Sequence, residues 1–166
     1  MKNNGFTIIE SLVAMAILLA AIAGASAALQ TGISSYIFSK DQVIAFYLAQ
    51  EGFEQVRNIR DENALAGRDW LTGLSDCFSP NSCTVSPVEN SNVAACGLFG
   101  TCPVLRQDTQ TGFFGYNALW PPTVLKREIQ LEQINGYEVS ILVTIDWSKG
   151  TASQSFRARE NIFNWP

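Results

Sequence analysis

A long uncharged segment near the N-terminus restricts what this chain can fold into more than any other feature. From Ser11 to Ser39 no residue carries a charge, and aliphatic side chains predominate. As a helix this segment would extend about 44 Å, whereas roughly 20 apolar residues are enough to cross the hydrocarbon core of a bilayer. The segment therefore predicts a membrane-spanning helix over residues 6–39.

One carboxylic acid, Glu10, stands at the start of this apolar segment. An ionised side chain at membrane depth costs roughly 3 kcal/mol unless it is paired. A cleavable signal peptide and a simple signal anchor both fit the apolar segment, and "AIAGASA" supplies small residues for cleavage. Both stay open as alternatives, but neither accounts for Glu10. Cleavage between Gly5 and Phe6 would create an α-amino group that the Glu10 of a neighbouring, staggered chain can pair with.

The N-terminal sequence "KNNGFTIIESLVAMAIL" resembles the class III signal of type IV prepilins and type II secretion pseudopilins. That signal has a short leader with a basic residue, then glycine, phenylalanine, three further residues, glutamate and a long apolar helix. Lys2, Gly5, Phe6 and Glu10 occupy these positions here. The combination is specific because it requires several residue types at fixed spacing at the extreme N-terminus.

The resemblance implies that residues 1–5 are a leader, which a prepilin peptidase removes after Gly5. It also implies N-methylation of Phe6 and pairing of the Phe6 amine with Glu10 of an adjacent subunit. Its implied partners are other pilin or pseudopilin subunits, the peptidase, an inner-membrane assembly platform and membrane lipid. The implied location is the inner membrane, crossed once, and then a cell-surface or periplasmic filament.

Residues 40–65 continue the helical pattern: they contain no proline and carry one apolar stripe. The stripe consists of Ala45, Ala49, Phe53, Val56 and Ile59 or Arg60. Glu54 and Arg57 are spaced for an ion pair on the polar side, and Gly67 is a suitable helix stop. The stretch "FYLAQEGFEQVRNIRDEN" is similar to the equivalent part of minor pilins and minor pseudopilins.

Residues 66–122 are rich in proline, glycine and small polar residues, which indicates loops and turns. The four cysteines form two closely spaced pairs, "CFSPNSC" and "CGLFGTC". We favour the local disulfides Cys77–Cys83 and Cys96–Cys102, because each intervening segment contains turn-forming residues. A zinc site of four thiolates remains an alternative, although the gaps are longer than zinc-binding pairs usually have. It also stays open whether the disulfides serve to present a loop that contacts a ligand.

Residues 123–166 show the period of two that is typical of strands. Leu125, Ile129 and Leu131 define one strand, and Asn135-Gly136 is a strong hairpin signal. A second strand alternates apolar and polar residues from Tyr137 to Trp147, a turn follows at "SKG", and a third strand carries Phe156, Ala158 and Ile162. This predicts a three-stranded antiparallel meander whose apolar face is covered by the stripe through Phe53 and Val56.

Two surface features have ordinary and functional interpretations. Lys126, Arg157 and Arg159 lie on the predicted outer face of the meander among Glu128, Glu132 and Asp146, which favours a solvated face over a nucleic-acid contact. The net charge of −4 also argues against a nucleic-acid partner. The aromatic residues of "TGFFGYNALWPP", which are Phe113, Phe114, Tyr116 and Trp120, either cap the core or form a contact surface.

No catalytic arrangement is evident. The chain has no histidine, and no paired carboxylates or phosphate-binding glycine loop. We therefore predict no enzymatic activity, no cofactor and no metal. The predicted fold is α+β and type IV pilin-like: a long N-terminal helix, membrane-spanning in its first half, packed on the meander, with a disulfide-containing loop region between. The predicted function is that of a minor type IV pilin or pseudopilin-like filament subunit. The process served by the filament (adhesion, motility, DNA uptake or secretion) stays open, as does a membrane-anchored binding module that does not polymerise.

Overall fold

The structure is a computed structural model that describes residues 7–86, 92–149 and 152–164. The leader, the predicted cleavage and methylation positions Gly5 and Phe6, and the turn at Gly150 lie outside the described residues. The chain divides into two compact units, Met1–Gln42 and Val43–Pro166, which are described separately below.

One helix, α1 (Ile8–Leu65), runs through the apolar segment and the amphipathic segment. It ends as the sequence predicts. Gly67 adopts the left-handed conformation with φ of 65°, which glycine takes without steric cost. The amide of Gly67 donates to the Ala64 carbonyl and the amide of Arg68 donates to the Asn63 carbonyl, over 3.1 and 2.9 Å. These two bonds form a Schellman motif, which satisfies the last carbonyls of the helix.

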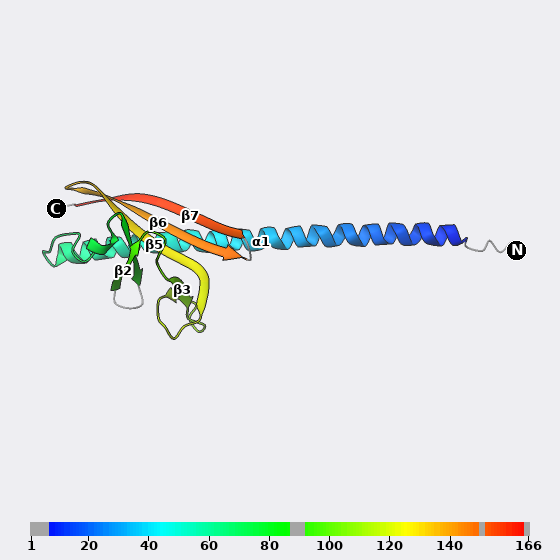
Figure 1. Cartoon of the computed structure of the whole chain (residues 1–166), viewed down its shortest axis with the longest axis horizontal. Helices are drawn as coiled ribbons and strands as arrows, with labels where there is room; N and C mark the ends of the chain where they lie inside the picture. The colour runs from blue at the N-terminus through cyan, green and yellow to red at the C-terminus, as the bar shows by residue number, and fades with distance from the viewer. Residues whose placement is uncertain (1–6, 87–91, 150–151, 165–166) are drawn as a thin grey trace. The chain divides into compact units, whose positions relative to one another are not determined.

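The Val43–Pro166 unit contains seven described strands in one antiparallel sheet (Figure 1). The strands are β1 (Asn81–Ser86), β2 (Asn92–Leu98), β3 (Val104–Gln107), β4 (Phe114–Gly115), β5 (Pro122–Asn135), β6 (Glu138–Lys149) and β7 (Ala152–Phe163). A short 3-10 helix, η1 (Ser75–Cys77), precedes them. Both edges of β5 are used: β6 pairs with one edge, while β1 and β3 pair with the other.

The predicted meander is confirmed as β5, β6 and β7. Asn135 pairs with Glu138 across the Asn-Gly turn, and Ile129 pairs with Val143 further along the β5–β6 ladder. The strands β6 and β7 pair over their whole length, from Glu138–Phe163 to Lys149–Ala152. Tyr137 does not continue the buried face of β6, because it belongs to the hairpin turn and is 74% exposed.

The segment predicted to consist of loops also contains the strands β1 to β4. Their sequences gave no alternating signal, since β1 reads "NSCTVS" and β2 includes Gly97 with φ of 83°. Strand β1 joins β5 through the pair Cys83 and Ile129. The cysteine-rich region is therefore an extension of the sheet that reaches beyond the meander.

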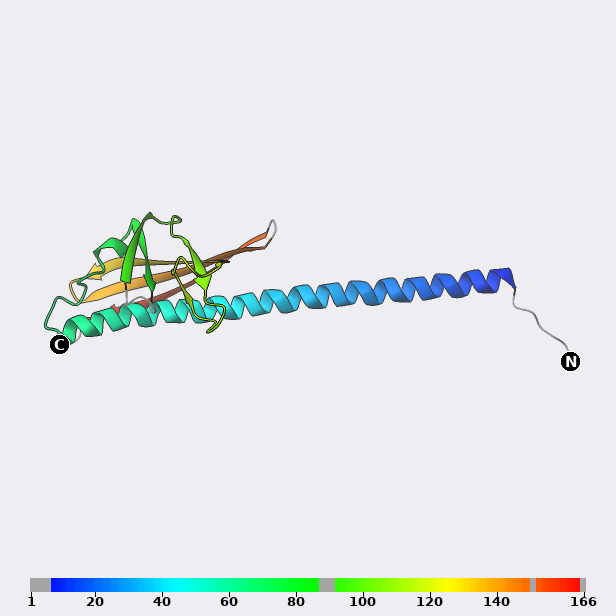
Figure 2. The same ribbon diagram turned by 90° about the horizontal axis from the view of Figure 1, so that it is seen from below.

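The core of this unit lies between the amphipathic part of α1 and the sheet (Figure 2). The predicted stripe is buried at Ala45, Ala49, Phe53, Val56 and Ile59, and Leu48 and Gly52 are buried with it. The facing strands contribute Ile129, Leu131, Val139, Ile141, Val143 and Ile145, which are all fully buried. The sequence did not identify Trp70 and Leu74, which follow the helix and complete the core.

A close approach at Gly52 explains why glycine stands in the middle of this helix. A β-carbon at Gly52 would lie 3.2 Å from Val143 Cγ1 and 3.6 Å from Arg127 Cδ. The distance of 3.2 Å to Val143 is shorter than side-chain contacts normally are, so α1 lies too close to the sheet here for a larger residue to fit without a shift.

The substitution Gly52→Leu should lower the free energy of unfolding by about 1–3 kcal/mol, because it overpacks a filled core. Urea denaturation followed by tryptophan fluorescence measures this, since Trp70 and Trp147 are buried. Asn58→Leu is the matched control: Asn58 is exposed on the same helix, and its replacement should change stability by less than about 0.5 kcal/mol. Equal effects of the two substitutions would contradict the close approach at Gly52.

Candidate assembly site

The N-terminus of α1 is capped by the side chain of Thr7. The Glu10 amide donates to Thr7 Oγ1 over 3.4 Å, and the amides of Glu10 and Ser11 donate to the Thr7 carbonyl over 3.1 and 3.2 Å. Threonine is a favoured residue at this position because its hydroxyl accepts a bond from an otherwise unpaired helix amide. The helix therefore begins at Ile8, so that Glu10 lies in its first turn with a fixed backbone.

The Glu10 side chain has no such partner in the part of the chain that the structure describes. Among the described residues, no hydrogen bond and no ion pair reaches its carboxylate, although its own amide is bonded. Glu10 lies in the first turn of α1. A carboxylate in that position is favoured by the helix dipole, but the dipole alone does not replace lost hydration in an apolar environment.

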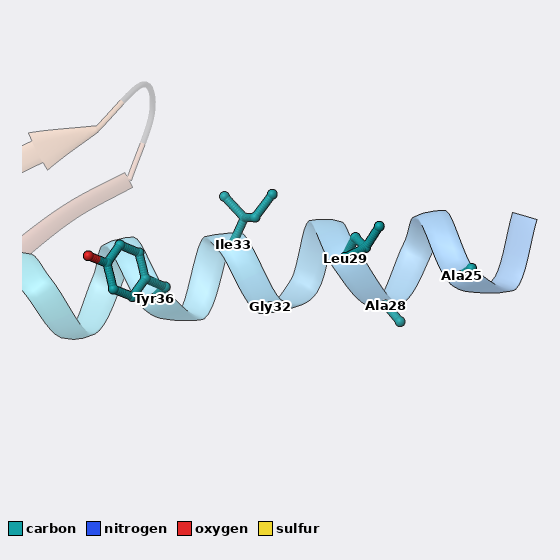
Figure 3. Close-up of a pocket in the computed structure, with 6 residues that line it drawn as sticks. All are labelled: Ala25, Ala28, Leu29, Gly32, Ile33 and Tyr36. Atoms are coloured by element: carbon teal, nitrogen blue, oxygen red, sulfur yellow. The ribbon is translucent and has the colours of Figure 1, made fainter.

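The surface of α1 in the Met1–Gln42 unit is apolar and exposed, and α1 is long and apolar enough to cross a membrane. Ala25, Ala28 and Gly32 leave a shallow groove on this surface, bordered by Leu29, Ile33 and Tyr36 (Figure 3). Small residues of this kind allow the backbone of a second helix to approach closely in lipid.

Both disulfides join the cysteines that are close in sequence. Cys77 bonds to Cys83 and Cys96 bonds to Cys102, each with Cα atoms 4.8 Å apart. The first disulfide links η1 to β1 and is fully buried. The second closes the turn between β2 and β3. In this oxidised state the four sulfur atoms are not available as zinc ligands.

The expectation that Glu128 faces solvent is wrong, because its side chain is completely buried. Its carboxylate accepts hydrogen bonds from the amides of Gly100 and Cys102 over 2.8 and 2.9 Å. The Lys126 ammonium lies 3.6 Å from the same carboxylate and donates to the Gly100 carbonyl over 3.0 Å. The disulfide-closed turn therefore covers this part of the outer face, which the pattern of β5 alone did not reveal.

Arg127 is a second buried charge, and sequence reasoning missed it as well. Its guanidinium donates to the Leu48 carbonyl of α1 over 3.3 Å and to the Val85 carbonyl of β1 over 2.7 Å. It also lies 3.4 Å from the Glu51 carboxylate, which provides an opposite charge. Arg127 thereby connects α1, β1 and β5 from a position that the alternating pattern reserves for an apolar residue.

The remaining charges of the outer face have partners within the fold. Arg159 pairs with Glu132 at 3.2 Å, and both side chains are exposed. The Arg157 guanidinium lies 5.8 Å from the centre of the Phe99 ring. The predicted pair on the helix is also present, with Arg57 and Glu54 2.6 Å apart, and Arg57 binds Glu160 of β7 in addition.

The aromatic segment divides into one exposed ring and three half-buried ones. Phe113 is 62% exposed, whereas Phe114 and Tyr116 pack against the core and Trp120 is half-buried near Gly115. The Tyr116 hydroxyl donates to the Arg127 carbonyl over 3.4 Å. Burial raises the pKa of Tyr116 above its ordinary value, with Arg127 opposing the shift. Most of this segment therefore completes the core.

Comparison with known proteins bears on the N-terminal segment. Residues 1–26 match the family model described as the prokaryotic N-terminal methylation motif. This segment is a class III prepilin signal. The curated proteins and the solved structures that were compared include no match to the chain. The prepilin signal and the exposed apolar helix that follows it fit a membrane-anchored pilin.

The described structure brings some predicted site residues together and leaves others separate. The four cysteines meet in pairs, far along the chain from Glu10. Glu10 lies on the exposed surface of α1 without a side-chain partner among the described residues, and its predicted partner, the amine of Phe6, lies outside them. The prepilin signal thus combines with an architecture that is α+β and pilin-like: one long N-terminal helix packed on an antiparallel sheet.

The substitution Thr7→Val should weaken the start of α1 by about 1 kcal/mol, because it removes the capping hydroxyl and keeps the side-chain shape. Hydrogen exchange at the Glu10 amide in detergent micelles should then become about fivefold faster. Thr31→Val is the control: the Thr31 hydroxyl donates to the Ala27 carbonyl within the helix, so its loss should leave the Glu10 amide unaffected. An unchanged Glu10 exchange rate in Thr7→Val would contradict the cap.

Proposed function

We propose that this protein is a structural subunit of a type IV pilus or a related secretion pseudopilus. In this proposal it inserts in the inner membrane through α1 and loses its leader to a prepilin peptidase. It then enters a helical filament with other pilin-like subunits. The observation that carries the proposal is the prepilin signal at residues 1–26, whose apolar part forms the start of the long exposed helix α1.

The Glu10 carboxylate, which has no partner among residues 7–86, 92–149 and 152–164, supports a role in assembly. Its cost in an apolar environment is offset only if a positive group reaches it. The described residues of its own chain do not supply that group. Cleavage after Gly5 would make a cation of Phe6, and an axially staggered neighbour would bring that amine to the depth of Glu10. The ion pair would then stabilise a subunit only when that subunit enters the filament.

The surface of α1 supports contact with other helices. The groove at Ala25, Ala28 and Gly32 offers a close approach, and the larger side chains Leu29 and Ile33 at its border provide packing area (Figure 3). In this proposal the contacts repeat head to tail without closing into a ring, which generates an open filament. The similarity of "FYLAQEGFEQVRNIRDEN" to minor subunits favours an accessory position over that of the main building block.

Mass spectrometry of the chain purified from membranes tests the processing. We expect a mature chain that begins at Phe6, lacks residues 1–5 and carries one added methyl group on the terminal nitrogen. Gly5→Leu is the matched variant, since it removes the small residue before the cleavage point and should leave the leader in place. A wild-type chain that retains Met1 would contradict processing.

The variant Glu10→Gln tests the assembly role. It keeps the size of the side chain but removes the charge, so the amount that co-purifies with sheared filaments should fall by about tenfold or more. Membrane insertion and protease resistance of the Val43–Pro166 unit should be unchanged, because that unit does not contain Glu10.

Ser11→Ala serves as the control for Glu10→Gln. It alters the neighbouring polar residue, whose hydroxyl donates to the carbonyl of the capping residue Thr7. We expect it to enter filaments at the wild-type level. If Glu10→Gln did so too, the pairing between the acid and a neighbouring amine would be refuted.

A further inference from the structure

The two disulfides of the chain differ in accessibility, and we propose that only one of them is a site of thiol–disulfide exchange. In this proposal Cys96 is the sulfur that a dithiol attacks, and the Cys96–Cys102 disulfide is a reducible latch on the turn between β2 and β3. Cys77–Cys83 remains a permanent link within the core. The inference is independent of the proposed function, because it concerns only contacts within the Val43–Pro166 unit.

Burial protects the first disulfide completely. Cys77 and Cys83 both have no solvent exposure and belong to the main core cluster with Ile129 and Leu131. Cys83 also pairs with Ile129 across the β1–β5 ladder. Exchange requires a thiolate to approach a sulfur atom directly. Reduction of this disulfide therefore requires the core itself to open.

Of the two cysteines in the second disulfide, Cys96 is partly exposed and Cys102 is buried. Cys96 is half-buried and lies within the edge strand β2, at the irregularity where Gly97 pairs with Ser82 and Ala95 pairs with Cys83. Cys102 is buried, and the Ser82 hydroxyl lies 3.6 Å from its sulfur. A nucleophile can therefore reach the Cys96 sulfur, and the Cys102 sulfur is the leaving group. The hydroxyl can donate to the thiolate that forms there.

The turn that this disulfide closes also has a second attachment. Glu128 accepts bonds from the amides of Gly100 and Cys102, and Lys126 donates to the Gly100 carbonyl. These bonds hold the turn over the sheet while the carboxylate stays buried. When the covalent link is lost, the turn is restrained by noncovalent contacts alone, which are these bonds together with the bond from the Phe99 amide to the Pro80 carbonyl and the contact of Arg157 with the Phe99 ring. Opening of the turn then exposes Glu128 to water. The redox state of Cys96–Cys102 thus controls how firmly the turn is closed.

The exchange with a dithiol balances as follows. One thiolate of the dithiol attacks Cys96 Sγ, the bond between Cys96 and Cys102 breaks, and its electron pair passes to Cys102 Sγ, which takes up a proton. The second thiolate of the dithiol attacks the dithiol sulfur of the mixed disulfide, and Cys96 leaves and is protonated. The dithiol ends as a cyclic disulfide, and the chain gains two hydrogens.

Timed reduction of the oxidised, full-length chain in detergent micelles tests the proposal. Dithiothreitol is the dithiol, iodoacetamide traps free thiols, and peptide mapping assigns them. We expect Cys96 and Cys102 to be labelled about tenfold or more faster than Cys77 and Cys83. In concentrated guanidinium the two rates should converge, which assigns the difference to folding. Equal rates in the folded chain, or faster reduction of Cys77–Cys83, would overturn the proposal.

Glu128→Gln tests the latch. An amide has one oxygen to accept a bond, and its NH₂ group opposes the second donor, so the turn should open more often. Reduction of Cys96–Cys102 should become several-fold faster, while Cys77–Cys83 should react as before. The control Glu132→Gln changes a carboxylate on the same strand that is 58% exposed in its side chain, and should alter neither rate.

Hydrogen exchange in the wild-type chain gives an answer that does not depend on any variant. The amides of Gly100 and Cys102 should be protected in the oxidised chain, because both donate to Glu128. After selective reduction they should exchange faster, while the amides of the β5–β6 ladder keep their protection. If reduction leaves the Gly100 and Cys102 amides equally protected, the disulfide does not act as a latch.

Discussion

The contact between the amphipathic part of α1 and the sheet is the interaction on which the Val43–Pro166 unit depends. Neither surface is stable in water alone, since the stripe through Phe53 and Val56 and the facing row through Ile141 and Val143 are both apolar. Each fully buried side chain of this size contributes about 1.5–3 kcal/mol. Because a folded domain has a net stability of only about 5–15 kcal/mol, a few of these contacts decide whether the sheet stays attached to the helix.

The same fold tolerates two buried charges, and it does so by surrounding each one with complementary groups. Arg127 has carbonyls from two other elements and the Glu51 carboxylate, while Glu128 has two amides and an ammonium group. Both charges lie on β5, the strand that is paired along both edges. Burying an ion costs several kcal/mol unless such partners are present. The free-energy cost of burying these two ions is offset by the contacts that they make, and these contacts join α1, β1 and the disulfide-closed turn to β5.

The sequence predicted the elements whose signal is local, and the structure confirms the long helix and the meander. Alternation from Val139 to Trp147 and the Asn-Gly turn specify strand pairing without knowledge of the rest of the chain. The strands of the cysteine-rich region were not predictable in this way, because β1 takes its place only when Cys83 meets Ile129. Glu128 and Arg127 were missed for the same reason: their partners lie on segments distant in sequence.

The candidate site was predictable to a different extent from the fold. The prepilin signal depends on residue types at fixed spacing, so residues 1–26 reveal it without any structure. The partner of Glu10 is not predictable from one chain's packing, since Glu10 lies on an exposed helix surface. The contacts within the described residues therefore explain where the helix starts, through the cap at Thr7. They do not identify the partner of the Glu10 carboxylate.

Glu10 and Glu128 together show how this chain handles a carboxylate in apolar surroundings. Glu128 is buried within one subunit, and the fold supplies two amide donors within 2.9 Å and a lysine. Glu10 borders the apolar segment and receives no donor from the described residues. A carboxylate without partners is stable in water but not in lipid. Among the described residues the requirement of the Glu10 carboxylate for a partner is therefore unmet, and a cationic group is the kind of partner that would meet it. The two acids thus differ in whether the described residues of the chain provide their partners, and the assembly role proposed for Glu10 agrees with that difference.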